Sequence, residues 1–155
     1  MQIDRLEEND WARLAKIRVE ALRDAPHAFG TRAEEAEAWP EAKWREQLRS
    51  LATFVAVVDG RDVGIVRGVK HHRLDDATYL ISMWVDPRAR RQGVGAALIE
   101  RVVQWAGRLG RRRVFLDVRA GNRAAECLYR AHGFAPTGVT QEDEGALEHE
   151  FVRTV

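Results

Sequence analysis

A glycine-rich segment in the middle of the chain has the residue types and spacing that bind a diphosphate. Gly93 and Gly95 follow an apolar stretch that ends at Asp86-Pro87, and they precede an amphipathic run. The start of a helix exposes backbone N–H groups and the positive end of the helix dipole, and glycines let a phosphate approach them closely. The segment therefore predicts a site for a ligand that contains a pyrophosphate.

Two common nucleotide-binding motifs do not fit this segment. The Rossmann motif needs a further glycine, but Leu98 occupies that position. The P-loop motif needs a Lys followed by Ser or Thr after its last glycine, and neither is present here. The ligand is thus expected to be held by a different fold.

The segment before Asp86 predicts a helical region followed by strands. Residues 1–6 fit a strand, and a helix capped by Asn9 or Asp10 should end before Pro26. A second helix opens at Pro40. Apolar runs predict three strands, at 54–58, 63–69 and 79–85. The first two form a hairpin, and the third is nearly all apolar, which is typical of a strand buried on both faces.

The segment after Asp86 predicts alternating helices and strands. One helix carries an apolar stripe from Leu98 to Ala106 and ends near Gly110. A strand at 114–118 leads to a helix at 122–132, with Gly133 as its C-terminal cap. Two last strands flank an acidic turn at 141–145. The elements predict an α/β fold.

Two motifs resemble those of the GNAT superfamily of N-acetyltransferases. Arg90-Arg91-Gln92-Gly93-Val94-Gly95, after Met83-Trp84-Val85-Asp86-Pro87, is similar to the family's acetyl-CoA signature, Q/R-x-x-G-x-G/A. The segment from Val118 to Phe134 resembles a second block, V-x-x-x-N-x-x-A-x-x-L-Y-x-x-x-G-F, and the branch that acetylates ribosomal-protein N-termini. The resemblance implies one GNAT domain over residues 1–155. Its mixed, mostly antiparallel sheet would be splayed between two central strands and flanked by helices.

The resemblance also implies how acetyl-CoA would be held in the split of the sheet. Backbone groups of Met83, Trp84 and Val85 would pair with the pantetheine arm, and Asn122 would contact the cofactor. Arg90 would neutralise charge on the pyrophosphate. The cradle for the pyrophosphate would be formed by the backbone of Arg91, Gln92, Gly93, Val94, Gly95 and Ala96.

Two residues are candidates for proton transfer. Asn122 and Tyr129 lie seven residues apart, or two helical turns, so both can face one cleft. The resemblance implies that Tyr129 protonates the departing CoA thiolate. It also implies a base at Asp117, where the ribosomal-protein branch has a longer Glu, so Asp117 would act through water. The alternative is that Asp117 pairs with Arg119 or Arg113.

Composition restricts the class of protein. The chain has 155 residues, 45% of them apolar, which fits one domain with a single core. The sequence shows no signal peptide or membrane span, so we expect a cytoplasmic protein. Cys127 is the only cysteine, which argues against disulfides and a thiolate metal site, and no metal is expected. Arginine clusters lack interleaved aromatic residues, so nucleic acid is an improbable partner.

The expected acceptor is a primary amine of a small molecule or a peptide, acetylated by direct attack in a ternary complex. The resemblance implies an acceptor wall formed by Phe29, Glu34, Glu35, Trp39 and residues 142–144. Two alternatives for the function stay open at this point: a protein N-terminal acetyltransferase and a CoA-binding regulatory module without turnover. The exposed final strands also offer a contact for a homodimer.

Overall fold

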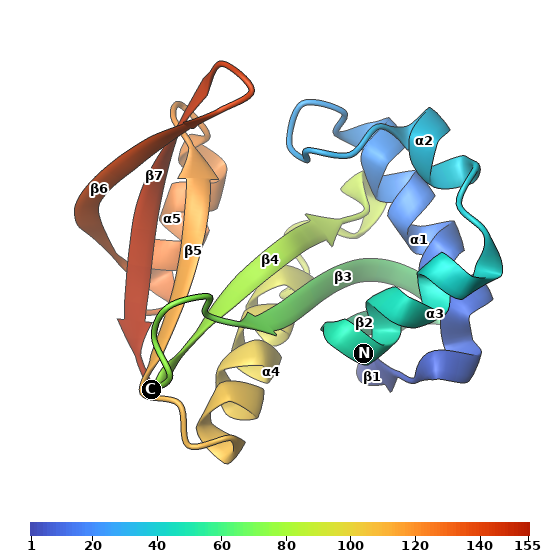
Figure 1. Ribbon diagram of the computed structural model, residues 1–155, viewed down its shortest axis with the longest axis horizontal. Helices are drawn as coiled ribbons and strands as arrows, with labels where there is room; N and C mark the ends of the chain where they lie inside the picture. Colours follow the sequence, from blue (N-terminus) through green and yellow to red (C-terminus); the bar gives the residue numbers. More distant parts are fainter.

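The computed structural model describes residues 1–155 as one seven-stranded sheet with helices on both faces (Figure 1). The strands are β1 (Gln2–Leu6), β2 (Ala52–Val58), β3 (Arg61–Lys70), β4 (Ala77–Val85), β5 (Arg113–Arg119), β6 (Ala135–Asp143) and β7 (Ala146–Thr154). The helices are α1 (Trp11–Asp24), α2 (Ala33–Glu37), α3 (Glu41–Ser50), α4 (Val94–Arg108) and α5 (Arg123–Ala131). The predicted α/β fold is confirmed.

The sheet divides into two parts at its only parallel strand pair. The strand order is β1-β2-β3-β4-β5-β7-β6, and every neighbouring pair other than β4 and β5 is antiparallel. β4 and β5 pair only where Ala77–Tyr79 meet Arg113–Phe115. Beyond that point the two strands diverge, as Figure 1 shows. The expected splay between two central strands is therefore present.

A bulge in β4 accompanies the divergence. Ile65 of β3 pairs with Trp84, but Arg67 pairs with Ile81, so two residues of β4 oppose one residue of β3. Ser82, at the bulge, has a φ of 59°. Bulges bend a strand and increase its twist. The expectation that 79–85 is buried on both faces is wrong here, since Ile81, Ser82 and Met83 are only half-buried.

Two hydrophobic cores hold the helices to the sheet. The apolar stripe of α4 lies against one face of the strands, in a core shared with Tyr129 and Phe134 of the α5 region. α1 and α3 contribute to a second core with Ile65 and Trp84. Gly68 allows the close approach of α4, because a Cβ there would lie 2.5 Å from Cζ3 of Trp105. No helix is both long and apolar enough to cross a lipid bilayer.

Candidate active site

The divergence of β4 from β5 opens a cleft of about 740 Å³. Its lining comes from α1 and the loop after it, from β3, β4 and β5, from α5, and from the last hairpin of β6 and β7. The cleft brings together four of the predicted catalytic and cofactor-binding residues, which are Met83, Asp117, Asn122 and Tyr129. Residues that are remote in the sequence thus meet at the point where the sheet splits.

Tyr129 lies deep in the cleft wall on α5. Its residue surface is only 7% exposed, and its ring packs edge-on against Phe134 with centroids 5.8 Å apart. Burial raises the pKa of the Tyr129 hydroxyl well above its ordinary value, because the phenolate would lose its hydration. The hydroxyl is therefore protonated at neutral pH, the state a proton donor requires.

Asn122 stands at the first turn of α5 and acts as its N-cap. Its side-chain oxygen accepts a hydrogen bond of 3.1 Å from the backbone N–H of Ala125. Such a cap satisfies one of the free donors at the helix start. The carboxamide nitrogen is then oriented by the cap and can donate to a ligand in the cleft.

Asp117 lies on β5 at the rim of the cleft, where its carboxylate accepts a hydrogen bond of 3.2 Å from Nε2 of Gln141. Neighbouring protein atoms displace part of its hydration, although the residue remains solvent-accessible. This desolvation, together with repulsion from Glu148, Glu150 and Asp143, raises the pKa of Asp117 to about 6. The carboxylate is thus a stronger base than an ordinary aspartate.

The alternative ion pairs considered for Asp117 do not form. Arg113 instead pairs with Asp76 at 3.0 Å, and Arg119 pairs with Asp143 at 3.7 Å. The pKa of Asp76 is lowered, chiefly by its hydrogen bond from Arg113. Asp117 therefore keeps its basic character, because no cation is bound to it.

The glycine-rich segment forms the start of α4. Gly93 is the N-cap residue with a φ of 80°, and no atom lies within 4 Å of the position its Cβ would occupy. The N–H groups of Val94, Gly95 and Ala96 belong to the first helical turn, which has no intrahelical acceptors. A Cβ at Gly95 would lie 3.1 Å from Leu128, which lines the cleft. The helix start therefore borders the cleft.

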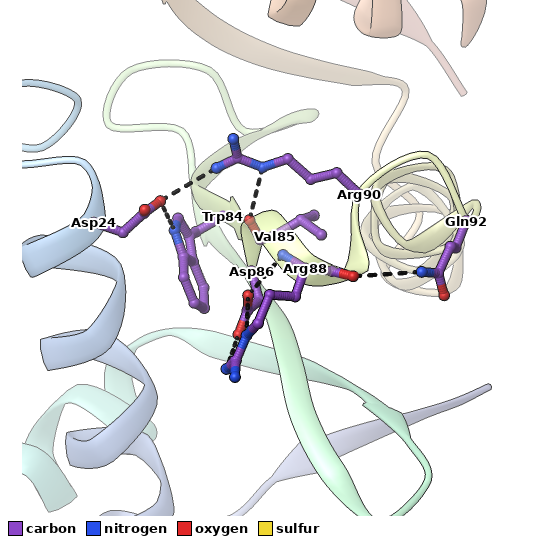
Figure 2. A network of polar contacts seen from close by, with 7 residues as sticks. All are labelled: Asp24, Trp84, Val85, Asp86, Arg88, Arg90 and Gln92. Carbon is purple, nitrogen blue, oxygen red and sulfur yellow. Dashed lines mark hydrogen bonds and ion pairs between the residues drawn. The ribbon is translucent and has the colours of Figure 1, made fainter.

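Figure 2 shows the contacts of Arg88 and Arg90 at this segment. Arg90 donates from Nε to the backbone oxygen of Val85 at 3.0 Å and from Nη2 to Asp24 at 3.2 Å. Asp24 also accepts a bond of 2.9 Å from the indole of Trp84. Arg90 thus ties the loop to the end of α1, and the side chain of Trp84 is in the core, away from the cleft.

The remaining arginines and the glutamine of the segment face solvent. Arg91 has a φ of 63° and an exposed side chain. Gln92 donates from Nε2 to the backbone oxygen of Arg88 at 3.5 Å. Arg88 itself binds Asp86, and this contact lowers the pKa of Asp86 to about 2. The loop is therefore braced internally, and Arg91 is a predicted site residue with an exposed charge.

Sequence reasoning missed two buried arginines in the same cleft. Arg18 of α1 is 5% exposed and Arg67 of β3 is 7% exposed, and both line the cleft. The signal was present in the patterns: Arg18 interrupts the apolar face formed by Leu14, Ile17 and Leu22. Arg67 interrupts the apolar run of β3. A charge inside an apolar pattern indicates a functional or paired group.

The expected acceptor wall is placed differently from the prediction. Of its residues Phe29 and Asp143 line the cleft, whereas Glu34, Glu35 and Trp39 do not. Trp39 packs instead against Trp44, with ring centroids 4.9 Å apart. Three of the acidic groups that line the cleft, Asp117, Asp143 and Glu148, come from β5 and the last hairpin. The fourth, Asp24 at the end of α1, is bound by Arg90 and Trp84.

Comparison with known proteins identifies the family. The sequence profile described as the acetyltransferase (GNAT) family matches residues 11–134. The chain belongs to the GNAT acetyltransferase family. The family resemblance predicted from the two motifs is therefore confirmed, and GNAT enzymes use acetyl-CoA as the acetyl donor.

Individual relatives share the motif region or the fold. A ribosomal protein bS18-alanine N-acetyltransferase of Escherichia coli (strain K12) is 44% identical over 61 residues, 39% of this chain and 40% of that protein. A GNAT acetyltransferase structure from Streptococcus pneumoniae superposes with a TM-score of 0.82 at 21% identity, covering 99% of this chain and 98% of its own. The acetyltransferase yncA from Salmonella typhimurium, solved with its cofactor acetyl-CoA, superposes with a TM-score of 0.78 at 20% identity, covering 99% and 93%.

The similarities cover different shares of the proteins that are compared. The match to the bS18-alanine relative spans about two fifths of that protein's length. The two structures are similar to this GNAT chain over nearly its full length, and at their low identity they establish the fold.

Proposed function

We propose that the chain is an N-acetyltransferase that transfers the acetyl group of acetyl-CoA to a primary amine of a small molecule or peptide, by direct attack in a ternary complex. The observation that carries this proposal is the cleft between β4 and β5, in which Asp117 and Tyr129 both reach one volume beside the start of α4. A base and an acid in one cleft are what amide formation from a thioester requires.

The chain has backbone groups that fit the donor. Acetyl-CoA supplies an activated acetyl thioester, a pantetheine arm with amide groups, and a pyrophosphate. The edge of β4 that faces β5 is unpaired beyond Tyr79, so N–H and C=O groups near Met83 to Val85 can bind the pantetheine amides. The first-turn N–H groups from Val94 to Ala96 can bind the pyrophosphate, and glycine at 93 keeps the approach open.

Asp117 is proposed to prepare the acceptor. An amine must lose a proton to attack a carbonyl carbon, and a carboxylate with a pKa of about 6 is ionised at neutral pH. Because the side chain of Asp117 is short, a water molecule would carry the proton to it. Gln141, which donates to the carboxylate at 3.2 Å, holds it at the rim.

Tyr129 is proposed to protonate the leaving thiolate. Its buried hydroxyl stays protonated at neutral pH and lies in the wall of the cleft. The same α5 carries Asn122 at its start, which places an amide donor on the same cleft. Proton transfer by a positioned side chain contributes about 10²- to 10⁴-fold to a rate.

Turnover and binding together test the proposal. We expect release of free CoA thiol from acetyl-CoA only when an amine from a panel of amino acids, polyamines and peptides is present. Tyr129→Phe should lower kcat about 10²-fold or more and leave the affinity for acetyl-CoA unchanged. Binding of acetyl-CoA without turnover on any amine, and without an effect of Tyr129→Phe, would instead support a CoA-binding regulatory module.

A protein N-terminal acetyltransferase is the nearest variant of this function. The partial similarity to the ribosomal protein bS18-alanine N-acetyltransferase of E. coli supports it. Acetylation of peptides in preference to single amino acids in the same panel would favour this variant. A homodimer and a cytoplasmic location stay predictions, and sedimentation of the purified chain tests the first.

A further inference from the structure

We infer that Arg18 and Arg67 form a subsite for a carboxylate, so that the acceptor is an amino-acid-like small molecule with an amine and a carboxylate. This inference rests on the proposed acetyl transfer and specifies its acceptor. Both arginines line the cleft that holds Asp117 and Tyr129, and both are more than nine-tenths buried.

Arg18 is a buried cation with no hydrogen-bonding partner for part of its guanidinium. Its Nη1 atom is inaccessible to solvent and binds no atom of the protein. The group that lies against its charge is the ring of Phe29, whose centroid is 5.1 Å from Cζ. Phe29 also lines the cleft. The guanidinium therefore lies at the cleft wall with donors that the protein does not use.

Only some of the N–H donors of Arg67 have hydrogen-bond acceptors in the protein, and these acceptors are neutral groups. It donates from Nε to Oγ of Ser82 at 2.9 Å and from Nη1 to Oε1 of Gln47 at 2.8 Å. A guanidinium carries five N–H groups, so donors remain. Ser82 is the residue of the β4 bulge, and this bond fixes Arg67 beside the point where β4 bends. The subsite is therefore tied to the split of the sheet.

The two charges lie close enough to affect each other. Burial lowers the pKa of Arg67 to about 9, and the charge of Arg18 acts in the same direction. Burial also lowers the pKa of Arg18 to about 10. Both remain cations at neutral pH, yet neither forms an ion pair with a carboxylate. Buried charges are normally paired, so an anionic ligand is the missing partner.

A carboxylate suits the subsite better than another anion would, because the opposite part of the cleft is acidic. Asp117 and Glu148 line that part, and they would attract the amine of the same molecule and repel a polyanion. Guanidinium groups bind carboxylates with paired N–H donors. A zwitterion such as an amino acid would satisfy both parts of the cleft.

Matched ligands and variants test this inference without relying on turnover. We expect N-acetyl-L-amino acids, which mimic the product, to raise the Tm of the wild type in the presence of CoA, and the matching N-acetyl amino acid amides to have no effect. Arg18→Met should abolish this rise without loss of fold, because it removes no hydrogen bond. Lys16→Met, which removes one exposed positive charge from the same helix, is the control.

Kinetics provide a second readout. For an amino acid acceptor, Arg18→Met should raise KM about 10- to 100-fold, the effect of losing hydrogen bonds to a charged group, with a smaller change in kcat. Arg67→Lys should retain part of the affinity, because it keeps the charge. KM for the amino acid amide should not change.

The outcomes separate the subsite from the acetyltransferase function. Equal effects of acids and amides, an acid effect that survives Arg18→Met, or no effect of any acid would overturn the carboxylate subsite. Binding of acetyl-CoA, measured on the same protein, would stand in each case and keep the proposed function. Loss of acetyl-CoA binding by the wild type would contradict the function instead.

Discussion

One end of the cleft is mainly acidic and the other carries two buried arginines, and the protein neutralises neither end completely. At one end, Asp117 and Glu148 line a wall in which only Asp143 has a cation, at 3.7 Å from Arg119. At the other end, Arg18 and Arg67 are buried without a carboxylate. Desolvation is the largest cause of the raised pKa of Asp117 and of the lowered pKa values of Arg18 and Arg67, and like charges nearby add to the shifts of Asp117 and Arg67.

The acidic and the basic end of the cleft differ in the solvent exposure of their charged side chains and in the role that we expect for them. Asp117 is open to solvent and can exchange protons with water, as a base must. The side chains of Arg18 and Arg67 are buried and keep their protons, which suits a fixed binding group. The acidic end is therefore expected to govern kcat and its dependence on pH, and the basic end the affinity for the acceptor.

The largest effect should follow removal of the base. Asp117→Asn should lower kcat about 10²- to 10⁴-fold, because proton removal from the amine loses its acceptor. KM for acetyl-CoA should stay the same, since the proposed contacts to the donor are made by backbone groups of β4 and of the start of α4. Steady-state kinetics measure both constants. Glu35→Gln, which removes an exposed carboxylate outside the cleft, serves as the control; a similar loss in that variant would rule out a specific role for Asp117.

Substitutions at Arg18 and Asp117 should also increase the stability of the fold, an effect smaller than the loss of kcat. Arg18→Met should stabilise the fold by about 1 to 3 kcal/mol at neutral pH, because it removes an unpaired buried charge. Asp117→Asn should stabilise it by at most about 1 kcal/mol, because solvent screens an exposed carboxylate. Each kcal/mol corresponds to a rise in Tm of about 2 to 4 °C for a chain of this size.

The pH dependence separates the two variants. The pKa of Asp117 rises from 3.8 to about 6 on folding, so the folded chain binds the proton more tightly and loses stability as pH increases between those values. The gain from Asp117→Asn should vanish at pH values below 3.8 and be complete above about 6. Arg18 keeps its charge across this range, so the stability gained by Arg18→Met should not change with pH. Thermal melts at several pH values measure these gains in stability. The same pH dependence of the gain in both variants would contradict the comparison.

The position of the glycine-rich segment and of α5 at the cleft could be predicted from the sequence because the signals in these segments are local. Gly93 and Gly95 lie in one short segment, and Asn122 and Tyr129 lie on one helix, so spacing alone relates them. The apolar stripe of α4 likewise indicates its buried face through the helical period of its residues. In these regions the sequence neighbours are also the spatial neighbours.

The two buried arginines of the cleft could not be predicted in the same way. Arg18 and Arg67 come from a helix and a strand that only the packing of α1 against the sheet brings together. The prediction of an acidic wall from Glu34 and Glu35 was wrong, because neither residue lines the cleft and both are exposed on α2. The exposure of β4 also depended on its short pairing with β5, which no local pattern reveals.

The most direct test of acetyl-CoA binding at the split of the sheet is isothermal titration calorimetry of a matched pair. Gly93→Asp and Gly93→Asn place side chains of the same size at the φ of 80°, so both carry the same backbone strain, and only the first adds a negative charge. We predict saturable binding by the wild type, modestly weaker binding by Gly93→Asn, and binding about 10-fold or more weaker again by Gly93→Asp, because the charge repels the pyrophosphate. Equal affinity of the two variants, or no binding by the folded wild type, would contradict the account.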